Sequence, residues 1–370
     1  MEKFRTETFF ALLRAGLWEQ DIALQPYGDV DFDDIYKLAE GQSVIGLIAA
    51  GIEHVVDVKV KKLEARPFLV WVITQERVNA DMNSFIVRLD SKLNESGVSS
   101  VLIKGQGVAQ CYARPQWRAL GDIDLLLDAD NYEKAKGILL PLASKIDKES
   151  VGAKHQGMTL EGFEVELHGA LKSLSRRMNT VIEEIQDGVN HSGDVRFWDN
   201  DGTAIPLPSA NADAIFIFTH ILKHFYKGGI GLRQICDWCR LLWTYRDSLD
   251  FPLLKRRLEA AGIMKEWKVF GSFAVDSLGM PADAMPFYED RPSLHRKASR
   301  LQAFIMIVGN FGHNRDMSYY HKYPYVMRKA ISASRRIGDG LSHMRIFPAD
   351  SIKFMFSSLV DGAKSAVRGE

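Results

Sequence analysis

The sequence predicts an α+β protein in which a small sheet lies between two helical regions. Apolar residues recur at helical spacing before residue 95 and again after residue 209. Between these regions the pattern changes to short apolar or alternating runs, which are typical of strands. We therefore expect a helical N-terminal region (1–95), an α+β core (96–205) and a helical C-terminal domain (206–370).

The composition limits the classes of function. Apolar residues make up 46% of the chain and charged residues 25%, the balance of a globular protein with a large core. Lys and Arg number 47 and so do Asp and Glu, and a net charge of zero argues against broad binding of long nucleic acid. Three cysteines are too few for a disulfide framework and favour a reducing cytoplasm. We find no signal peptide and no apolar run long enough to span a membrane.

The elements of the core follow in order. A strand over 98–103 leads into Gly105-Gln106-Gly107, and a short helix is expected over 108–113. The next strand is expected over 122–127, and Asp128 has the side chain of an N-cap for a helix over 131–139. Two further strands, 154–160 and 163–168, are joined by two residues that suit a tight hairpin turn. Beyond Pro206 and Pro208 the chain is expected to be helical.

The hairpin register follows from its two-residue turn. It places Gly157 opposite Glu166 and His155 opposite His168, all on one polar face of the hairpin. Because glycine has no side chain, we expect open space in front of Glu166.

Three carboxylates are predicted to converge. Asp122 and Asp124 alternate along one strand and share a face, whereas Ile123 and Leu125 point into the core. Glu166 supplies the third acid from the hairpin. Clustered carboxylates repel one another unless a cation lies among them, and their hard oxygen atoms suit Mg²⁺ or Mn²⁺. Two such ions can bind the attacking and leaving oxygens of a phosphoryl transfer.

The turn after the first core strand suits a phosphate. Free backbone N–H groups at a strand-to-helix junction favour anions, and Lys104 and Arg118 add positive charge for a triphosphate. Taken singly, each of these features is more often an ordinary turn or a surface charge. Their order along the chain supports the prediction.

In this order the motifs resemble the nucleotidyltransferase superfamily that includes DNA polymerase beta. More closely, they resemble the bacterial family called "uncharacterised nucleotidyltransferase". The resemblance covers about residues 95–245 and is found in Leu102-Ile-Lys-Gly105, Arg118, Gly121-Asp-Ile-Asp-Leu-Leu-Leu127, Val165-Glu-Leu-His168, His220 and Leu232-Arg-Gln-Ile-Cys-Asp237.

The resemblance implies a small mixed sheet of the nucleotidyltransferase type and the transfer of an NMP group from an NTP to an acceptor hydroxyl. It implies that Asp122 and Asp124 bind both metal ions and that Glu166 is the third ligand and the base. The residues expected to bind the nucleotide are Lys104, Gly105, Gln106, Gly107, Arg118, His168 and Arg233. Gln106 stands where the superfamily often has serine, and Glu166 stands where it commonly has aspartate.

Other readings remain open. A small-molecule, sugar or protein acceptor is favoured over a long nucleic acid, and the alternative function is a catalytically silent nucleotide-binding or interaction protein. His220 and His224 share a helix face and suit a place near the nucleotide, a zinc site or helix packing. Cys236 and Cys239 fit a buried helix better than a redox site. A basic tail (321–370) with an apolar segment (351–359) permits peripheral membrane contact, although a solvated, packed helix is favoured.

Overall fold

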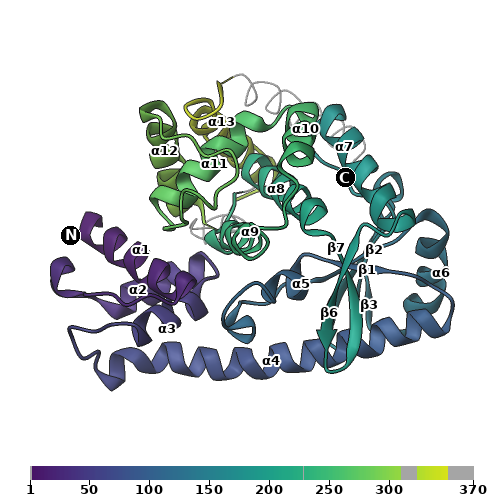
Figure 1. The fold of residues 1–370 in the computed structure, drawn as a ribbon, viewed down its shortest axis with the longest axis horizontal. Coiled ribbons are helices and arrows are strands. Elements are labelled where there is room, and N and C mark those ends of the chain that lie inside the picture. The colour runs from purple at the N-terminus through teal and green to yellow at the C-terminus, as the bar shows by residue number, and fades with distance from the viewer. Residues whose placement is uncertain (1, 228, 310–322, 349–370) are drawn as a thin grey trace.

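The computed structural model describes residues 2–227, 229–309 and 323–348 (Figure 1). The apolar segment 351–359 noted in the sequence lies outside these residues. Within them no helix combines the length and the apolar character needed to cross a membrane.

The described chain is mostly helical and carries one five-stranded sheet and one two-stranded sheet, which confirms the predicted α+β class. The helices are α1 (Glu2–Trp18), α2 (Phe32–Gly41), α3 (Ile45–Glu53), α4 (Lys62–Glu95), α5 (Gly105–Ala109), α6 (Ala129–Leu139), α7 (Arg176–His191), α8 (Ala210–Lys227), α9 (Leu232–Thr244), α10 (Phe251–Ala261), α11 (Met264–Asp276), α12 (Pro292–Val308) and α13 (Tyr325–Met344). The strands are β1 (Val101–Ile103), β2 (Ile123–Leu126), β3 (Lys145–Ile146), β4 (His155–Leu160), β5 (Phe163–His168), β6 (Val195–Asn200) and β7 (Thr203–Pro208).

The larger sheet has the strand order β1-β2-β5-β4-β3 and is mixed, because β2 and β5 run parallel while the other neighbours are antiparallel. The β4–β5 hairpin has the predicted register, with Gly157 opposite Glu166 and His155 opposite His168. Its turn residues both have positive φ, as a two-residue hairpin turn of this hand requires. The parallel pair places Asp124 directly beside Glu166.

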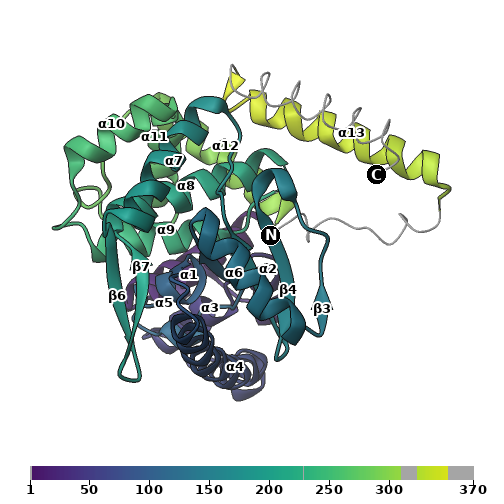
Figure 2. The same ribbon diagram turned by 90° about the vertical axis from the view of Figure 1, so that its right-hand side faces the viewer.

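The two faces of this sheet are covered by different helices. One face packs against the C-terminal half of α4 and against α6, and this core contains Ile123, Leu125 and Leu167. Asp128 caps α6 as predicted, with its side chain accepting hydrogen bonds from two backbone N–H groups. Figure 2 shows α4 end-on below the sheet and the helices α7 to α12 gathered above it. The second face of the sheet, which carries Asp124, is therefore turned toward the C-terminal helices.

A second, larger core joins the two helical regions of the chain. Buried residues of α1 to α3 and of α8 to α12 belong to one hydrophobic cluster, centred on large side chains such as Phe9, Phe218 and Trp238. Helix α1 therefore packs with helices that lie more than 200 residues later in the sequence. Contacts of this kind leave no local pattern in the sequence, so they were not predicted.

The local differences from prediction have physical reasons. Strand β2 begins at Ile123, so Asp122 precedes the strand, and α5 begins at Gly105, so the glycine turn is the first turn of the helix. The β6–β7 hairpin was not predicted, because Pro206 and Pro208 were interpreted as a boundary between regions. These prolines lie in β7, whose only ladder partner in the described chain is β6, and edge strands of this kind tolerate proline.

Candidate functional site

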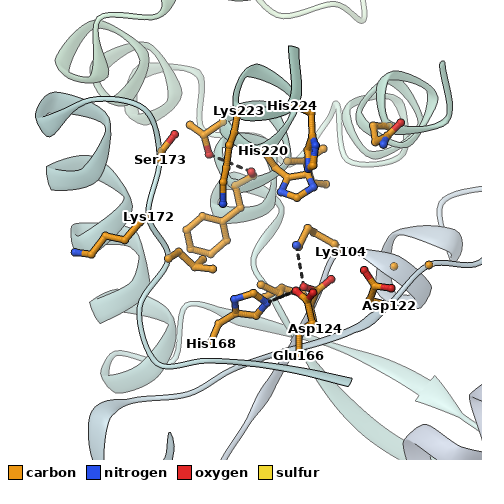
Figure 3. Close-up of a pocket in the computed structure, with 18 of the residues that line it drawn as sticks. Lys104, Asp122, Asp124, Glu166, His168, Lys172, Ser173, His220, Lys223 and His224 are labelled. Atoms are coloured by element: carbon orange, nitrogen blue, oxygen red, sulfur yellow. Dashed lines mark hydrogen bonds and ion pairs between the residues drawn. The ribbon is translucent and has the colours of Figure 1, made fainter. Parts of the chain in front are cut away.

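A cavity of about 560 Å³ lies over the polar face of the sheet (Figure 3). Asp124 of β2 and Glu166 of β5 form its floor, and Lys223 reaches into it from α8. Eight of the ten predicted site residues line the cavity: Lys104, Gly105, Arg118, Asp122, Asp124, Glu166, His168 and Arg233.

Asp124 is buried between two nitrogen donors. The Lys104 ammonium lies 2.9 Å from Asp124 Oδ1, and His168 Nε2 lies 2.7 Å from the same oxygen. Burial disfavours the charged imidazole, but the hydrogen bonds to Asp124 and Glu166 outweigh burial and raise the pKa of His168. Positive charge therefore collects around Asp124 from two separate segments of the chain.

Glu166 is held by two imidazoles. His155 Nε2 lies 3.1 Å from Glu166 Oε2, and His168 Nε2 lies 3.3 Å from the same oxygen. Burial opposes ionisation of this acid, yet the two hydrogen bonds prevail and lower the pKa of Glu166. Glu166 is therefore an anion at neutral pH. His155 was identified in the sequence only as a cross-strand neighbour, and the predicted register is the signal that could have added it to the site.

Asp122 lies to one side of the other two acids (Figure 3). Burial, and then the negative charges of Glu166 and Asp124, raise the pKa of Asp122. Among the described residues, the group with ligand atoms within 4.8 Å of one another is His155, Glu166 and His168, and it does not include Asp122. The three carboxylates thus share a cavity and suit a divalent cation by their chemistry, without converging on one point.

Lys104 has an unusual backbone conformation. Its φ of 59° and ψ of −146° lie in a region that residues other than glycine seldom adopt, and strain of this kind is common at functional sites. The next residue, Gly105, also has positive φ, and a Cβ there would lie 3.2 Å from the Asp122 carbonyl oxygen. This tight junction between β1 and α5 brings the Lys104 side chain over Asp124.

Gln106 and Gly107 do not line the cavity. The Gln106 side chain is buried and donates to Asn79 Oδ1 of α4 at 2.7 Å. A Cβ on Gly107 would lie 2.7 Å from Leu207 of β7, so this glycine permits close packing. The Gln106 side chain is therefore hydrogen-bonded to α4 and does not reach the predicted phosphate site.

Arg118 and Arg233 brace the segment that leads to the aspartates. Arg118 donates from Nε and Nη2 to the two carboxylate oxygens of Asp237 at 2.7 and 2.8 Å, in buried surroundings. Arg233 donates to the Ala119 carbonyl oxygen at 3.1 Å and also to that of Leu120. Both arginines border the cavity. The bonds of Arg118 occupy all three of its nitrogens, whereas both bonds of Arg233 come from Nη1. Asp237, the partner of Arg118, ends a segment that carries the family resemblance, but it was not predicted as a site residue.

Helix α8 supplies the opposite wall of the cavity. His220 and His224 share a face as predicted, with ring centroids 4.3 Å apart. Burial and the nearby Lys104 charge lower the pKa of both imidazoles, that of His224 to about 4, so both are neutral at pH 7. Within the described chain neither belongs to a cluster of three metal-type ligands. Lys223, between them in sequence, points toward the carboxylates (Figure 3).

The sequence also predicted open space in front of Glu166. Glu166 faces the cavity, but the space at Gly157 is filled, because a Cβ there would lie 2.8 Å from Asp147 Oδ2. The short strand β3 that leads to Asp147 had not been predicted.

Cys236 and Cys239 are fully buried, as expected, and burial raises the pKa of both thiols, which disfavours a redox role.

Comparison with known proteins adds one finding. A family model described as "Uncharacterised nucleotidyltransferase" matches residues 28–270, which include the whole sheet and the cavity walls from β1 to α9. The comparisons with curated proteins and with solved structures found no significant match.

Proposed function

This chain belongs to the uncharacterised nucleotidyltransferase family, and from that premise we propose that its cavity binds an NTP and transfers the NMP group to an acceptor hydroxyl. The observation that carries the proposal is the pairing of Asp124 with Glu166 on adjacent parallel strands at the floor of the cavity. Two carboxylates in register on a rigid sheet can hold a reacting group in a fixed position.

Asp122, Asp124 and Glu166 are the residues that would hold divalent cations, Mg²⁺ or Mn²⁺. Such ions, when bound, neutralise charge on the phosphate oxygens and activate the attacking hydroxyl. Burial, and then the negative charges of Glu166 and Asp124, raise the pKa of Asp122, and a cation among the three acids would relieve the repulsion between them.

The cationic side chains suit the triphosphate. Lys104 and Lys223 line the cavity from opposite walls, and an ammonium group binds phosphate as a compact point charge. Arg118 and Arg233 act in this proposal as positioning residues, because their hydrogen bonds fix the segment before Asp122. The lowered pKa of Glu166 favours a role as a ligand over a role as proton acceptor, because a weakly basic carboxylate is a poor general base.

The acceptor is proposed to be a small molecule, a sugar or a protein. A cavity of about 560 Å³ is of the size that binds small molecules, and the chain has no net positive charge to attract a long nucleic acid.

The test is incubation of the protein with each labelled NTP in turn, with Mg²⁺ or Mn²⁺ and a cell extract. We expect label to appear on an acceptor with the wild-type protein and with Glu164→Gln, which changes an exposed acid of the same hairpin. We expect no label with Asp124→Asn. Metal-dependent NTP binding without any labelled product would favour the alternative, a catalytically silent nucleotide-binding protein.

A further inference from the structure

Two imidazoles and one carboxylate meet at the edge of the cavity. The ligand atoms of His155, Glu166 and His168 all lie within 4.8 Å of one another, and no other group of three such residues in the described chain meets this criterion. The three come from the adjacent strands β4 and β5, on the same face of the hairpin.

The separations fit a coordination sphere. Bonds of about 2.1 Å from a metal ion to nitrogen and oxygen put neighbouring ligand atoms roughly 3.0 Å apart in an octahedron and roughly 3.4 Å apart in a tetrahedron. Glu166 Oε2 lies 3.1 Å from His155 Nε2 and 3.3 Å from His168 Nε2, within that range. Two of the three pairs of ligand atoms are therefore already at the spacing of a coordination sphere, and the third pair lies within 4.8 Å.

The backbone holds this group firmly. His155 is bridged to Ser150, whose N–H donates to the His155 carbonyl at 2.9 Å, and on its other side it faces His168. The His168 carbonyl accepts from the Leu127 N–H at 3.0 Å, which ties the end of β5 to β2. Side chains anchored on paired strands lose little freedom when they bind a ligand. His155 and Glu166 are each about one-third exposed, so an ion can enter from solvent.

We propose that His155, Glu166 and His168 bind a divalent transition-metal ion such as Zn²⁺, Co²⁺ or Mn²⁺, in preference to Mg²⁺. Imidazole nitrogen is a borderline-soft ligand that suits transition metals, whereas Mg²⁺ prefers oxygen and gives up its water reluctantly. Asp124 Oδ1 lies 2.7 Å from His168 Nε2, the nitrogen that would bind the ion, so Asp124 is placed to approach the ion as a further oxygen ligand.

This inference deepens the proposed function. It rests on that function for the role of the ion in nucleotidyl transfer, because Glu166 belongs both to the proposed catalytic site and to this metal site. It assigns one cation position in the cavity to a transition metal and leaves the position near Asp122 to oxygen ligands alone. Binding of the ion to these three residues needs no nucleotide, so it can be measured separately from transfer.

The test is a Co²⁺ titration of the metal-free, full-length protein without nucleotide, followed by visible absorption spectroscopy and by calorimetry. We expect ligand-field absorption bands that saturate at one Co²⁺ per chain and that persist in a large excess of Mg²⁺. His155→Ala is expected to weaken Co²⁺ binding at least about 10-fold, because changes around a metal site commonly cost this much or more. Glu164→Gln, on the same face of β5 but outside the group, is the matched control and should bind Co²⁺ as the wild type does.

A second measurement does not depend on a variant that folds. Pulsed EPR of Mn²⁺ bound to the wild-type protein is expected to show coupling to imidazole ¹⁴N. Absence of that coupling, Co²⁺ binding that survives His155→Ala unchanged, or displacement of Co²⁺ by equimolar Mg²⁺ would each overturn the proposal. A failure to label any acceptor in the transfer assay, with the Co²⁺ site intact, would instead count against the proposed function alone.

Discussion

The two faces of strands β2 and β5 differ completely, although their residues alternate along the same few positions. Ile123, Leu125 and Leu167 are buried against α4 and α6, in a core made of apolar side chains. Asp124 and Glu166, one position away in each strand, face the cavity and carry charge. The apolar face is completed by α4 and α6, whereas the charged face is completed by groups from the β1–α5 junction, β4 and α8.

Alternation along a strand determines which side chains share a face, but it does not determine which groups from the rest of the chain those side chains contact. Burying a carboxylate is costly unless partners offset the lost hydration. On the charged face Lys104 and His168 provide that compensation for Asp124, and His155 and His168 provide it for Glu166. We conclude that this face is built to hold charge, and the following predictions test the contrast between the faces.

The largest expected effect comes from Asp124→Asn, set beside the neighbouring change Ile123→Val. Loss of a proposed metal ligand should lower the rate of nucleotidyl transfer by at least about 10³-fold. Ile123→Val, on the other face, should leave the rate near normal and cost about 0.5–1.5 kcal/mol of stability. Turnover assays and urea unfolding of the two variants separate these effects. Equal transfer rates in both would remove Asp124 from the site.

The opposite pattern is expected for Leu125→Ala. This side chain is buried in the core beneath the sheet, so truncation should lower the free energy of unfolding by about 2–5 kcal/mol. NTP affinity of the folded fraction should change little, since the residue points away from the cavity. Urea unfolding and calorimetry measure the two quantities. A large loss of NTP affinity in the protein that remains folded would show that the faces are not independent.

A third prediction concerns Glu166→Gln, which keeps the size of the side chain and removes its charge. We expect the transfer rate to fall by more than NTP affinity falls, because a ligand to the reacting centre acts mainly in the transition state. Steady-state kinetics and calorimetry provide the comparison. A near-normal rate in this variant would exclude Glu166 from the mechanism.

The smallest effect is a pH dependence of the metal-free protein. The pKa of His168 is raised, so its stabilising contribution is complete below about 6.5 and is lost as pH rises through the raised pKa. The pKa of Glu166 is lowered, so its contribution is complete above about 4.5 and is lost as pH falls. The difference in the free energy of unfolding between wild type and His168→Gln should therefore be largest, on the order of 1 kcal/mol, between about pH 4.5 and pH 6.5. Urea unfolding across pH 4 to 9 measures it. A difference that grows above pH 8 would contradict the assignment.

Local pattern predicted the sheet well. The register that places His155 opposite His168 followed from a two-residue turn, and the inward side of β2 followed from alternation at Ile123 and Leu125. Spatial proximity of Asp124 and Glu166 was an expectation from the order of motifs, and the structure brings them side by side.

Long-range partners escaped prediction because nothing in the local sequence marks them. Arg118 is bound by Asp237, 119 positions later, and Gln106 by Asn79 on a helix that precedes it. Arg118 was predicted to bind the triphosphate from its charge and its place before Asp122, and its buried ion pair with Asp237 leaves it little capacity for a phosphate. The roles proposed for the site residues and the three-part domain division remain predictions.

The central claim is that cations must bind the charged face before the cavity can hold an NTP productively. Calorimetric titration of NTP into the wild-type protein, with Mn²⁺ and with EDTA, tests it most directly when Asp124→Asn is measured beside it. The account predicts binding that is strong with Mn²⁺ and sharply weaker with EDTA in the wild type, and weak under both conditions in the variant. Equal NTP affinity with and without the cation, unchanged by Asp124→Asn, would contradict it.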